Sequence, residues 1–278
     1  MRILVALLAA LALGGIAHAA PTQVIWHGHA AFQIVTPKGA VLLIDPWLGN
    51  PQNPAAQGGK DPLAGIEKAD YILLTHGHFD HVGEAVAIAK KTGAKLISNF
   101  ELGKQMVSRL GYPEGQVGFD TQMNIGGEIT VAGGEVKVSM VLAVHASGVD
   151  VPGDGGRKTD TVYGGNPAGF IVTIKDGPTI YHTGDTAYFS DMHMIGDDNK
   201  IDLVLVNIGG HFGMEPFWAA KAAEASNAKL VVPMHWKTFP VLNQDEGSFL
   251  KLLDSVRIKH RVMKPGGTLT YDGKTPRP

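Results

Sequence analysis

Cysteine is absent from all 278 residues of the sequence. Without cysteine the chain forms no disulfides, binds no zinc or iron–sulfur cluster through thiolates, and has no thiol nucleophile. A site for a transition metal must therefore be built from imidazole and carboxylate side chains. The chain contains 12 His and 26 Asp and Glu residues, so both ligand types are available.

An excess of positive charge is also missing. The 24 Lys and Arg against 26 Asp and Glu residues give a formal net charge of −2. A dedicated nucleic-acid-binding protein usually has a basic surplus, so we expect no nucleic-acid partner. With 44% hydrophobic and 18% charged residues, the composition is typical of a globular protein with a sizeable core.

Long apolar runs are scarce, and the main one is at the N-terminus. Arg2 precedes an apolar stretch at residues 3–16, and residues 17–19 (AHA) have the small-x-small pattern of a signal cleavage site. No later stretch has the 18 consecutive apolar residues of a membrane-spanning helix. We therefore expect residues 1–19 to be a secretory signal peptide. Residues 20–278 would form one periplasmic or secreted domain without stable membrane insertion.

Short apolar runs alternate with Gly- and Pro-rich breaks, which predicts a mixed α/β (α+β) fold with both sheet types. Strands are expected at residues 24–25, 32–35, 40–44, 71–74, 95–98, 129–132, 136–144, 169–175, 179–181, 203–207, 230–233, 261–263 and 268–271. Helices are expected at residues 83–92, 101–110, 215–226 and 247–255. Residues 46–62 and 147–168 are expected to be long loops that form walls of a site.

The strongest motif is the segment THGHFDH at residues 75–81, directly after an expected strand. It places His76, His78, Asp80 and His81 within six residues, and a tight turn at Gly77 would let them converge. Neutral imidazole and carboxylate are ligands for zinc and other divalent first-row metals. The H-x-H-x-D-H spacing therefore predicts a metal site.

Three further candidate ligands each lie at the end of an expected strand, namely His145, Asp185 and His235. In sheets covered by helices, ligand sites collect where strands end and loops converge. The repeated pattern predicts that four separate strands deliver ligands to one edge.

Taken in order, these motifs resemble the metallo-β-lactamase superfamily. The segments GHAAF (28–32), IDP (44–46), HTGDT (182–186), NIGGH (207–211) and PMHW (233–236) are similar to its metal-dependent hydrolase branch, which includes ascorbate-6-phosphate lactonase-like proteins. The resemblance implies a four-layer αβ/βα sandwich with the metals between two sheets. By analogy, a homo-oligomer is a further expectation.

The resemblance also implies two divalent ions, Zn²⁺ or alternatively Mn²⁺ or Fe²⁺. A metal-bridging hydroxide would then attack a small-molecule lactone, ester, amide or phosphodiester. Asp80 would also act catalytically by orienting the hydroxide or relaying its proton. The implied ligands are His76, His78 and His145 for the first metal, Asp80, His81 and His235 for the second, and Asp185 as the bridge.

Three polar residues are expected near these ligands. Asp45 would accept a hydrogen bond from a metal-bound imidazole or cap the turn at Pro46. His29 would contact a ligand or the substrate, or be a satisfied core histidine. His211 would bind substrate or stabilise an oxyanion, or be a structural turn residue.

Four further residues are given less specific roles. We expect a structural role for His182. Arg157, Lys158 and Tyr163 lie in the long loop after His145 and would contact an anionic substrate or be solvated.

Other functions are weighed against hydrolysis. An antibiotic-hydrolysing metallo-β-lactamase uses either a Cys ligand, absent here, or a Cys-free pattern without the bridging Asp. A tRNA-processing type of nuclease fits poorly with export and an acidic chain. Di-iron oxidoreductases of the superfamily have Glu at the position of His78. A non-catalytic periplasmic metal-binding protein would not require so complete a ligand set.

Overall fold

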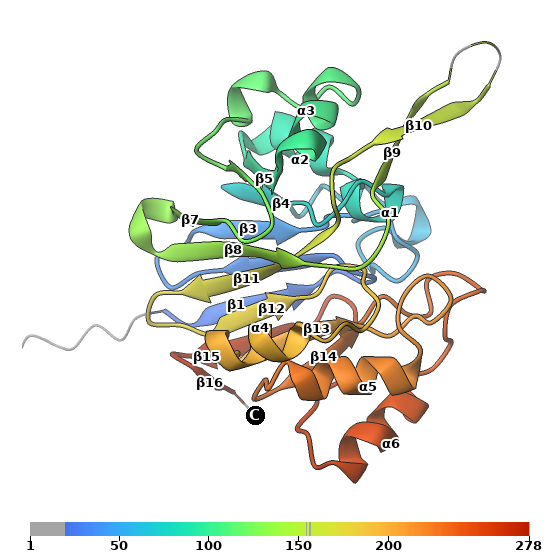
Figure 1. Ribbon diagram of the computed structural model, residues 1–278. Coiled ribbons are helices and arrows are strands. Elements are labelled where there is room, and N and C mark those ends of the chain that lie inside the picture. The colour runs from blue at the N-terminus through green and yellow to red at the C-terminus, as the bar shows by residue number, and fades with distance from the viewer. Residues whose placement is uncertain (1–19, 154, 156, 278) are drawn as a thin grey trace, which may run out of the picture.

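The computed structural model describes residues 20–153, 155 and 157–277 (Figure 1). The expected signal peptide, residues 1–19, lies outside these residues. In this part of the chain, no helix combines the length and the apolar character needed to cross a membrane.

One sheet, in the described residues, has eight strands in the order β16-β15-β1-β2-β3-β4-β5-β6. Strands β1 to β3 form the expected antiparallel meander, and β3 to β6 run parallel. The strands are β1 Thr22–Trp26, β2 Phe32–Val35, β3 Val41–Ile44, β4 Tyr71–Leu73, β5 Lys95–Asn99, β6 Gln122–Met123, β15 Thr268–Asp272 and β16 Thr275–Pro276.

The second sheet has six strands in the order β14-β13-β12-β11-β8-β7. Strands β7, β8, β11 and β12 pair antiparallel, whereas β12, β13 and β14 are parallel. The strands are β7 Glu128–Val131, β8 Val136–Leu142, β11 Ala168–Ile174, β12 Thr179–His182, β13 Leu203–Asn207 and β14 Val231–Met234.

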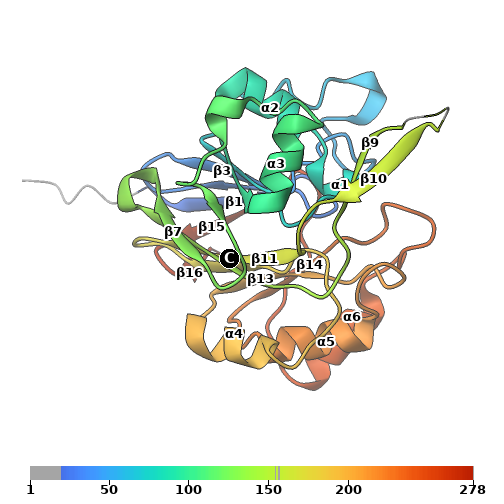
Figure 2. The same cartoon turned by 45° about the horizontal axis from the view of Figure 1, so that its top comes forward.

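Helices cover the outer faces of both sheets (Figures 1 and 2). Helices α2 and α3 lie over the first sheet, and α4, α5 and α6 lie over the second. This arrangement is the expected four-layer sandwich, so the predicted fold class is confirmed. The helices are α1 Phe79–Val82, α2 Ala85–Thr92, α3 Phe100–Ser108, α4 Met192–Asn199, α5 Pro216–Ala225 and α6 Gly247–Ser255, with 3₁₀ turns at Gln57–Gly59, Glu114–Gln116 and Ala132–Gly134.

Two apolar clusters hold the layers together. The larger lies between the sheets and includes Phe32 and Phe170, and the smaller packs Ile88 and Met106 of α2 and α3 onto the first sheet. Strand β3 is buried at every position because it is covered on both faces. The strands are therefore fixed in position, and their ends can place side chains accurately at the sandwich edge.

The structure corrects several local predictions. Residues 261–263 form no strand, because the chain makes only an isolated bridge between Val231 and His260 there. Helix α4 was not predicted, since its sequence MHMIGDDN contains Gly, two Asp and Asn, which are weak helix formers. The predicted loop at residues 147–168 contains the hairpin of β9 (Gly148–Pro152) and β10 (Thr159–Tyr163), which projects from the body (Figures 1 and 2).

Candidate metal centre

The implied metal ligands gather at one edge of the two sheets. His76 lies just after β4, His145 three residues after β8, Asp185 three residues after β12, and His235 directly after β14. The neighbouring strands β12, β13 and β14 are parallel, so their carboxyl ends open onto the same edge.

His76, His78 and His145 form the first group. Each offers a ring nitrogen, and the three nitrogens lie within 4.8 Å of one another. His76 Nε2 is 3.0 Å from His78 Nδ1, and the His145 ring centroid is 5.1 Å from both other rings. The structure thus brings together the three residues implied for the first metal.

A second group joins His29 to Asp80, His81 and His235, again with ligand atoms within 4.8 Å of one another. It contains the three residues implied for the second metal. His29 is the additional member, placed there by the turn between β1 and β2.

Asp185 lies between the two groups. Its Oδ2 is 3.0 Å from His235 Nε2 and 3.4 Å from His81 Nε2, both in the second group. The same oxygen is 3.7 Å from His145 Nε2 of the first group. Asp185 therefore lies between the two groups, where the resemblance implies a bridging residue.

Asp45 holds two ligand rings in place. Its Oδ1 accepts a hydrogen bond from the Thr75 amide (2.8 Å), and its Oδ2 accepts bonds from the Thr75 hydroxyl (2.6 Å) and His81 Nδ1 (2.7 Å). The Thr75 hydroxyl proton points to Asp45, so His76 Nδ1 must donate to Thr75 Oγ1 at 2.9 Å. His76 and His81 therefore both direct Nε2 toward the centre, as metal-binding imidazoles do.

Several buried polar atoms at the centre make no hydrogen bond, namely His81 Nε2, Asp185 Oδ1 and both ring nitrogens of His235. The Nε2 atoms of His81 and His235 lie beside the Asp185 carboxylate as ion pairs. A buried polar group without a hydrogen bond costs about 1–3 kcal/mol. A buried set of imidazole nitrogens and carboxylate oxygens is also the donor set of zinc sites. The residues present therefore fit divalent metal ions.

The histidines of the first group are neutral. Burial lowers the pKa values of His76, His78 and His145 below that of free imidazole. Burial, aided by the nearby His235, also lowers the pKa of His29 to about 3. Neutral imidazole is the form that binds a metal.

The second group is dominated by charge pairing. Burial opposes a charge on His235, but the Asp185 carboxylate outweighs it and raises the His235 pKa to about 9. Burial likewise raises the pKa of Asp185, but His235 and His81 lower it well below its usual range. The centre therefore stabilises the ionised Asp185 carboxylate. The positive charge beside this carboxylate can come from a protonated histidine or from a bound metal ion.

The three residues expected near the ligands differ in their placement. His29 is fully buried, with Nε2 3.0 Å from Asp80 Oδ2 and Nδ1 2.5 Å from Thr238 Oγ1. Asp45 contacts the ligand His81, as expected. His211 is exposed and packs against Phe212; within the described chain it makes no hydrogen bond or ion pair with a ligand.

His182 has the structural role expected for it. Its Nε2 donates to the Ala30 carbonyl (2.9 Å), and its Nδ1 accepts from the Gly184 amide (3.1 Å). Both ring nitrogens are thus occupied by the backbone, so neither is available to a metal.

The backbone at the centre is locally strained. His29, Asp45 and His235 have φ values of 51°, 46° and 58°, in the left-handed region that is costly for residues other than glycine. Such residues cluster at functional sites. Gly77 lies in a bend at residues 75–77, and a Cβ there would meet Val149 Cγ2 at 2.6 Å, so close packing also favours glycine at this position.

A cavity of about 550 Å³ opens onto the ligands His78, Asp80, His145, Asp185 and His235. The rest of its wall was not predicted from the sequence. Phe79 could have been predicted to line the cavity, because it lies inside the ligand motif. The segment after His235 has no recognisable pattern that would have indicated such a role. The remaining lining residues are Phe79, Asp150, Phe212, Phe239, Pro240, Val241 and Leu242.

The candidate substrate contacts of the long loop do not line this cavity. Arg157 Nε instead pairs with Asp160 at 3.0 Å, and the Tyr163 hydroxyl donates to Asn166 at 3.3 Å. The hairpin contributes Asp150 near its base.

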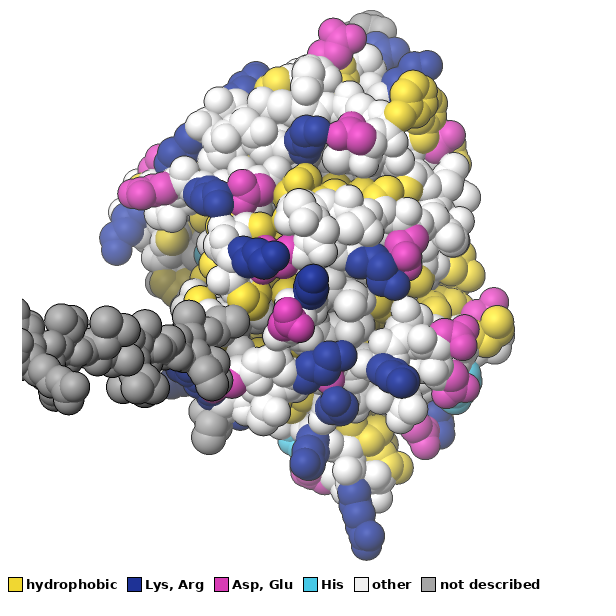
Figure 3. All heavy atoms as spheres, turned by 90° about the vertical axis from the view of Figure 1, so that its left-hand side faces the viewer, with side chains coloured by type: hydrophobic (Ala, Val, Ile, Leu, Met, Phe, Trp, Pro, Cys, Tyr) yellow, Lys and Arg dark blue, Asp and Glu magenta, His cyan; other side chains and the backbone are white. Residues whose placement is uncertain are grey.

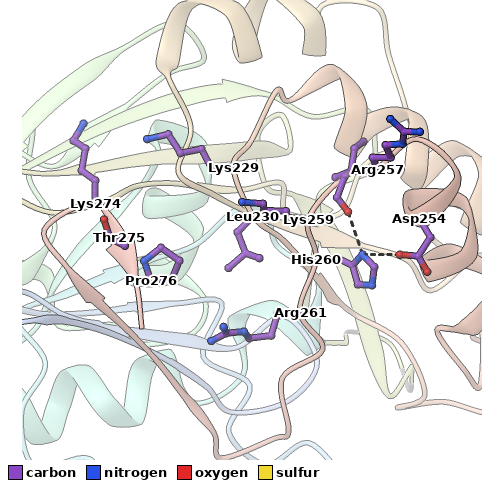
Figure 4. Close-up of a pocket in the computed structure, with 11 residues that line it drawn as sticks. Lys229, Leu230, Asp254, Arg257, Lys259, His260, Arg261, Lys274, Thr275 and Pro276 are labelled. Carbon is purple, nitrogen blue, oxygen red and sulfur yellow. Dashed lines mark hydrogen bonds and ion pairs between the residues drawn. The ribbon is translucent and has the colours of Figure 1, made fainter. Parts of the chain in front are cut away.

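A larger cavity, of about 760 Å³, lies away from the metal centre (Figure 4). It borders Lys229 and Leu230, just before β14, whereas His235 follows the other end of that strand. None of the implied ligands lines it, so this larger hollow is not the metal site. Five cationic side chains line it: Lys229, Arg257, Lys259, Arg261 and Lys274.

Comparison with known proteins agrees with this geometry. A model of the β-lactamase superfamily domain matches residues 41–236. The chain is 48% identical over 243 residues to a UPF0173 metal-dependent hydrolase of Thermodesulfovibrio yellowstonii, covering 87% of this chain and 89% of the relative. A UPF0173 metal-dependent hydrolase of Pyrobaculum arsenaticum is 43% identical over 249 residues, covering 89% and 99%.

Solved structures show the same relationship. Igni18, a metallo hydrolase from the archaeon Ignicoccus hospitalis, superimposes with a TM-score of 0.74 at 31% identity, covering 90% of this chain and 98% of that one. Isothiocyanate hydrolase from Delia radicum gut bacteria shares the fold alone, at 17% identity and a TM-score of 0.65, with 90% and 99% covered. The chain therefore belongs to the β-lactamase superfamily, among its metal-dependent hydrolases.

Proposed function

We propose that this protein is an exported, binuclear metal-dependent hydrolase of a small-molecule ester, lactone, amide or phosphodiester. The observation that carries the proposal is the position of Asp185, within 3.7 Å of His145 in one ligand group and 3.0 Å of His235 in the other. One carboxylate shared by two adjacent ligand groups suits a pair of ions better than a single ion.

Each ligand group would hold one ion, with Asp185 shared between them. Bound divalent ions would supply a water nucleophile activated at neutral pH and an electrophile for the carbonyl or phosphoryl oxygen. The first group is His76, His78 and His145, and the second is Asp80, His81 and His235.

Asp80 is suited to orient a water molecule. Burial raises its pKa, but His235 and His29 lower it well below the usual range, so the carboxylate is ionised and can accept a hydrogen bond from water. Its side chain is 13% exposed and lines the cavity, so it is accessible to substrate. The neutral His29 donates to it from Nε2 and fixes its orientation.

Elemental analysis and activity assays test the proposal. Protein purified after expression of the full-length gene and loading with Zn²⁺, Mn²⁺ or Fe²⁺ should contain two ions per chain. It should hydrolyse members of a panel of esters, lactones, amides and phosphodiesters, and His76→Ala should abolish turnover. Two bound ions without turnover would favour a non-catalytic metal-binding protein, and turnover of a β-lactam alone would favour an antibiotic hydrolase.

Export is tested separately. The proposal rests on the signal-like pattern of residues 1–19, so cell fractionation followed by N-terminal sequencing should find a chain beginning near Ala20 or Pro21 outside the cytoplasm. An uncleaved chain in the cytoplasmic fraction would refute export and leave the hydrolase proposal intact.

A further inference from the structure

We propose that the substrate is an uncharged ester, lactone or amide that presents an apolar group to the cavity, and not an anion such as a phosphodiester. This inference rests on the proposed hydrolase function and names its substrate class. It is carried by the part of the cavity lining that is not made of implied ligands, which is apolar except for Asp150 and contains no cation among its described residues.

The apolar wall is unusually exposed. Phe79 is 57% exposed, Phe212 57% and Val241 55%, and all three face the same cavity. Exposed apolar side chains gathered in one hollow mark a binding site, because a ligand that covers them removes apolar surface from water. A substrate group that fills this cavity should therefore gain binding energy from each methylene that it buries.

Part of the wall, Phe79 and Phe239, packs against Trp47 next to the implied ligands. Phe239 stacks on Trp47 with centroids 5.5 Å apart and planes 12° apart, and the Trp47 centroid lies 5.8 Å from that of Phe79. His29, which fixes Asp80, packs edge-on against both Trp47 (5.1 Å) and Phe239 (5.8 Å). An apolar group placed against Phe79 and Phe239 would thus lie beside the implied metal ligands.

The charges around the cavity disfavour an anion. Apart from the implied ligands, its charged lining residue is Asp150, whose Oδ1 accepts a hydrogen bond from Thr161. Sites for phosphates and carboxylates use Arg, Lys or helix N-termini as partners. In the described chain, the hairpin cation Arg157 is paired with Asp160, and the five cations described above lie at the other cavity (Figure 4).

Figure 3 shows the face at the end of the sandwich away from α1 and the hairpin of β9 and β10. Lys and Arg side chains on that face are interspersed with Asp and Glu. Because bound metal ions would polarise carbonyl and phosphoryl oxygens alike, discrimination between the two classes falls to the lining residues.

A matched pair of substrates tests the inference. p-Nitrophenyl hexanoate and the mono-p-nitrophenyl ester of adipic acid have the same reacting bond and chain length, but only the second carries a distal carboxylate. We expect kcat/KM to be at least tenfold higher for the hexanoate. Across the acetate, butyrate and hexanoate esters, kcat/KM should rise by up to about fourfold per buried methylene.

A matched pair of variants ties the effect to the wall. Val241→Lys places a cation in the cavity and should reverse or abolish the preference for hexanoate over the adipate ester. Val256→Lys is the control, since Val256 is 50% exposed, much like Val241 at 55%, but lies outside this cavity. It should leave both rates unchanged.

A binding measurement separates this inference from the proposed hydrolysis. The uncharged apolar probe N-phenyl-1-naphthylamine should bind the chelator-treated protein, with its fluorescence reduced by Val241→Lys and not by Val256→Lys. If the probe binds in this way but no ester is turned over, the proposed function fails and the apolar site stands. If esters are turned over with equal preference for the adipate ester, or Val241→Lys changes neither readout, the substrate class proposed here is wrong.

Discussion

His29 Nε2 lies 3.0 Å from Asp80 Oδ2, while the other nitrogen of the same ring lies 2.5 Å from Thr238 Oγ1. His29 is fully buried, and burial together with His235 lowers its pKa to about 3, so the ring is neutral. Because the Asp80 carboxylate can only accept a hydrogen bond, His29 donates one to it from Nε2. His29 Nδ1 then accepts a hydrogen bond from the Thr238 hydroxyl. A buried hydrogen-bond chain thus fixes the orientation of Asp80.

Replacement of His29 by alanine should lower kcat by about 10- to 100-fold, because the ligand Asp80 loses the group that orients it. Metal content should fall less than activity, and His29→Gln, which keeps a donor, should restore part of kcat. The exposed His193, whose ring partner is Tyr188, provides the control variant His193→Gln. A His29→Ala enzyme with full activity and an unchanged pH profile would show that the contact has no positioning role.

Asp45→Asn should weaken metal binding by about 10- to 100-fold. The substitution replaces an acceptor of bonds from His81 and Thr75 by an amide that cannot accept them all, so His76 and His81 lose their fixed ring orientation. Competition with a chromogenic chelator measures the affinity. An unchanged affinity, in a variant with an unchanged melting temperature, would mean that the two rings are held by packing alone.

Local patterns in the sequence were enough to predict the candidate ligands that the structure brings together, because each lies within three residues after a strand or in the H-x-H-x-D-H segment. His29 could be given only as a candidate, since its role depends on Thr238, which is 209 residues away in the chain. His211 follows two glycines after β13, in a turn where φ is 65° at Gly210 and 23° at His211. In the described chain the His211 side chain is exposed and makes no ion pair with an implied ligand.

Tertiary packing also decided what local patterns could not. The segment at residues 239–242 reads as an ordinary apolar stretch, and only its position beside Trp47 and Phe79 makes it a cavity wall. The hairpin of β9 and β10 escaped prediction because β10 alternates exposed with half-buried residues and shows no hydrophobic period. The apolar residues near 261–263 suggested a strand, but the second sheet makes only a single bridge there.

Metal binding should stabilise the fold. Buried atoms of His81, Asp185 and His235 that make no hydrogen bond would contact the metal ion instead. A ligand at 100 times its Kd contributes about 2.7 kcal/mol to the free energy of unfolding. For a domain of this size we expect a rise in melting temperature of roughly 5–10 °C on adding Zn²⁺ to chelator-treated protein, measured by calorimetry. In Asp185→Ala the rise should shrink, and an equal rise in that variant would exclude Asp185 as a ligand.

Metal uptake should release protons below about pH 9. Burial disfavours the charged His235, but Asp185 raises its pKa to about 9, so at neutral pH the metal-free ring carries a proton that a metal must displace. In the metal-free protein the raised pKa of His235 stabilises the folded state. This contribution is complete below about pH 6.5, the pKa of the residue in the unfolded chain, and is lost as pH rises through about 9.

Apparent metal affinity should accordingly fall as pH decreases below 9. Titration calorimetry in two buffers of different ionisation enthalpy, at one pH near 7, measures the number of protons released directly. His235→Gln, which does not titrate, should release fewer protons than the wild-type protein. Equal release by both proteins would show that His235 is already neutral before the metal binds, contrary to the pairing with Asp185 at 3.0 Å.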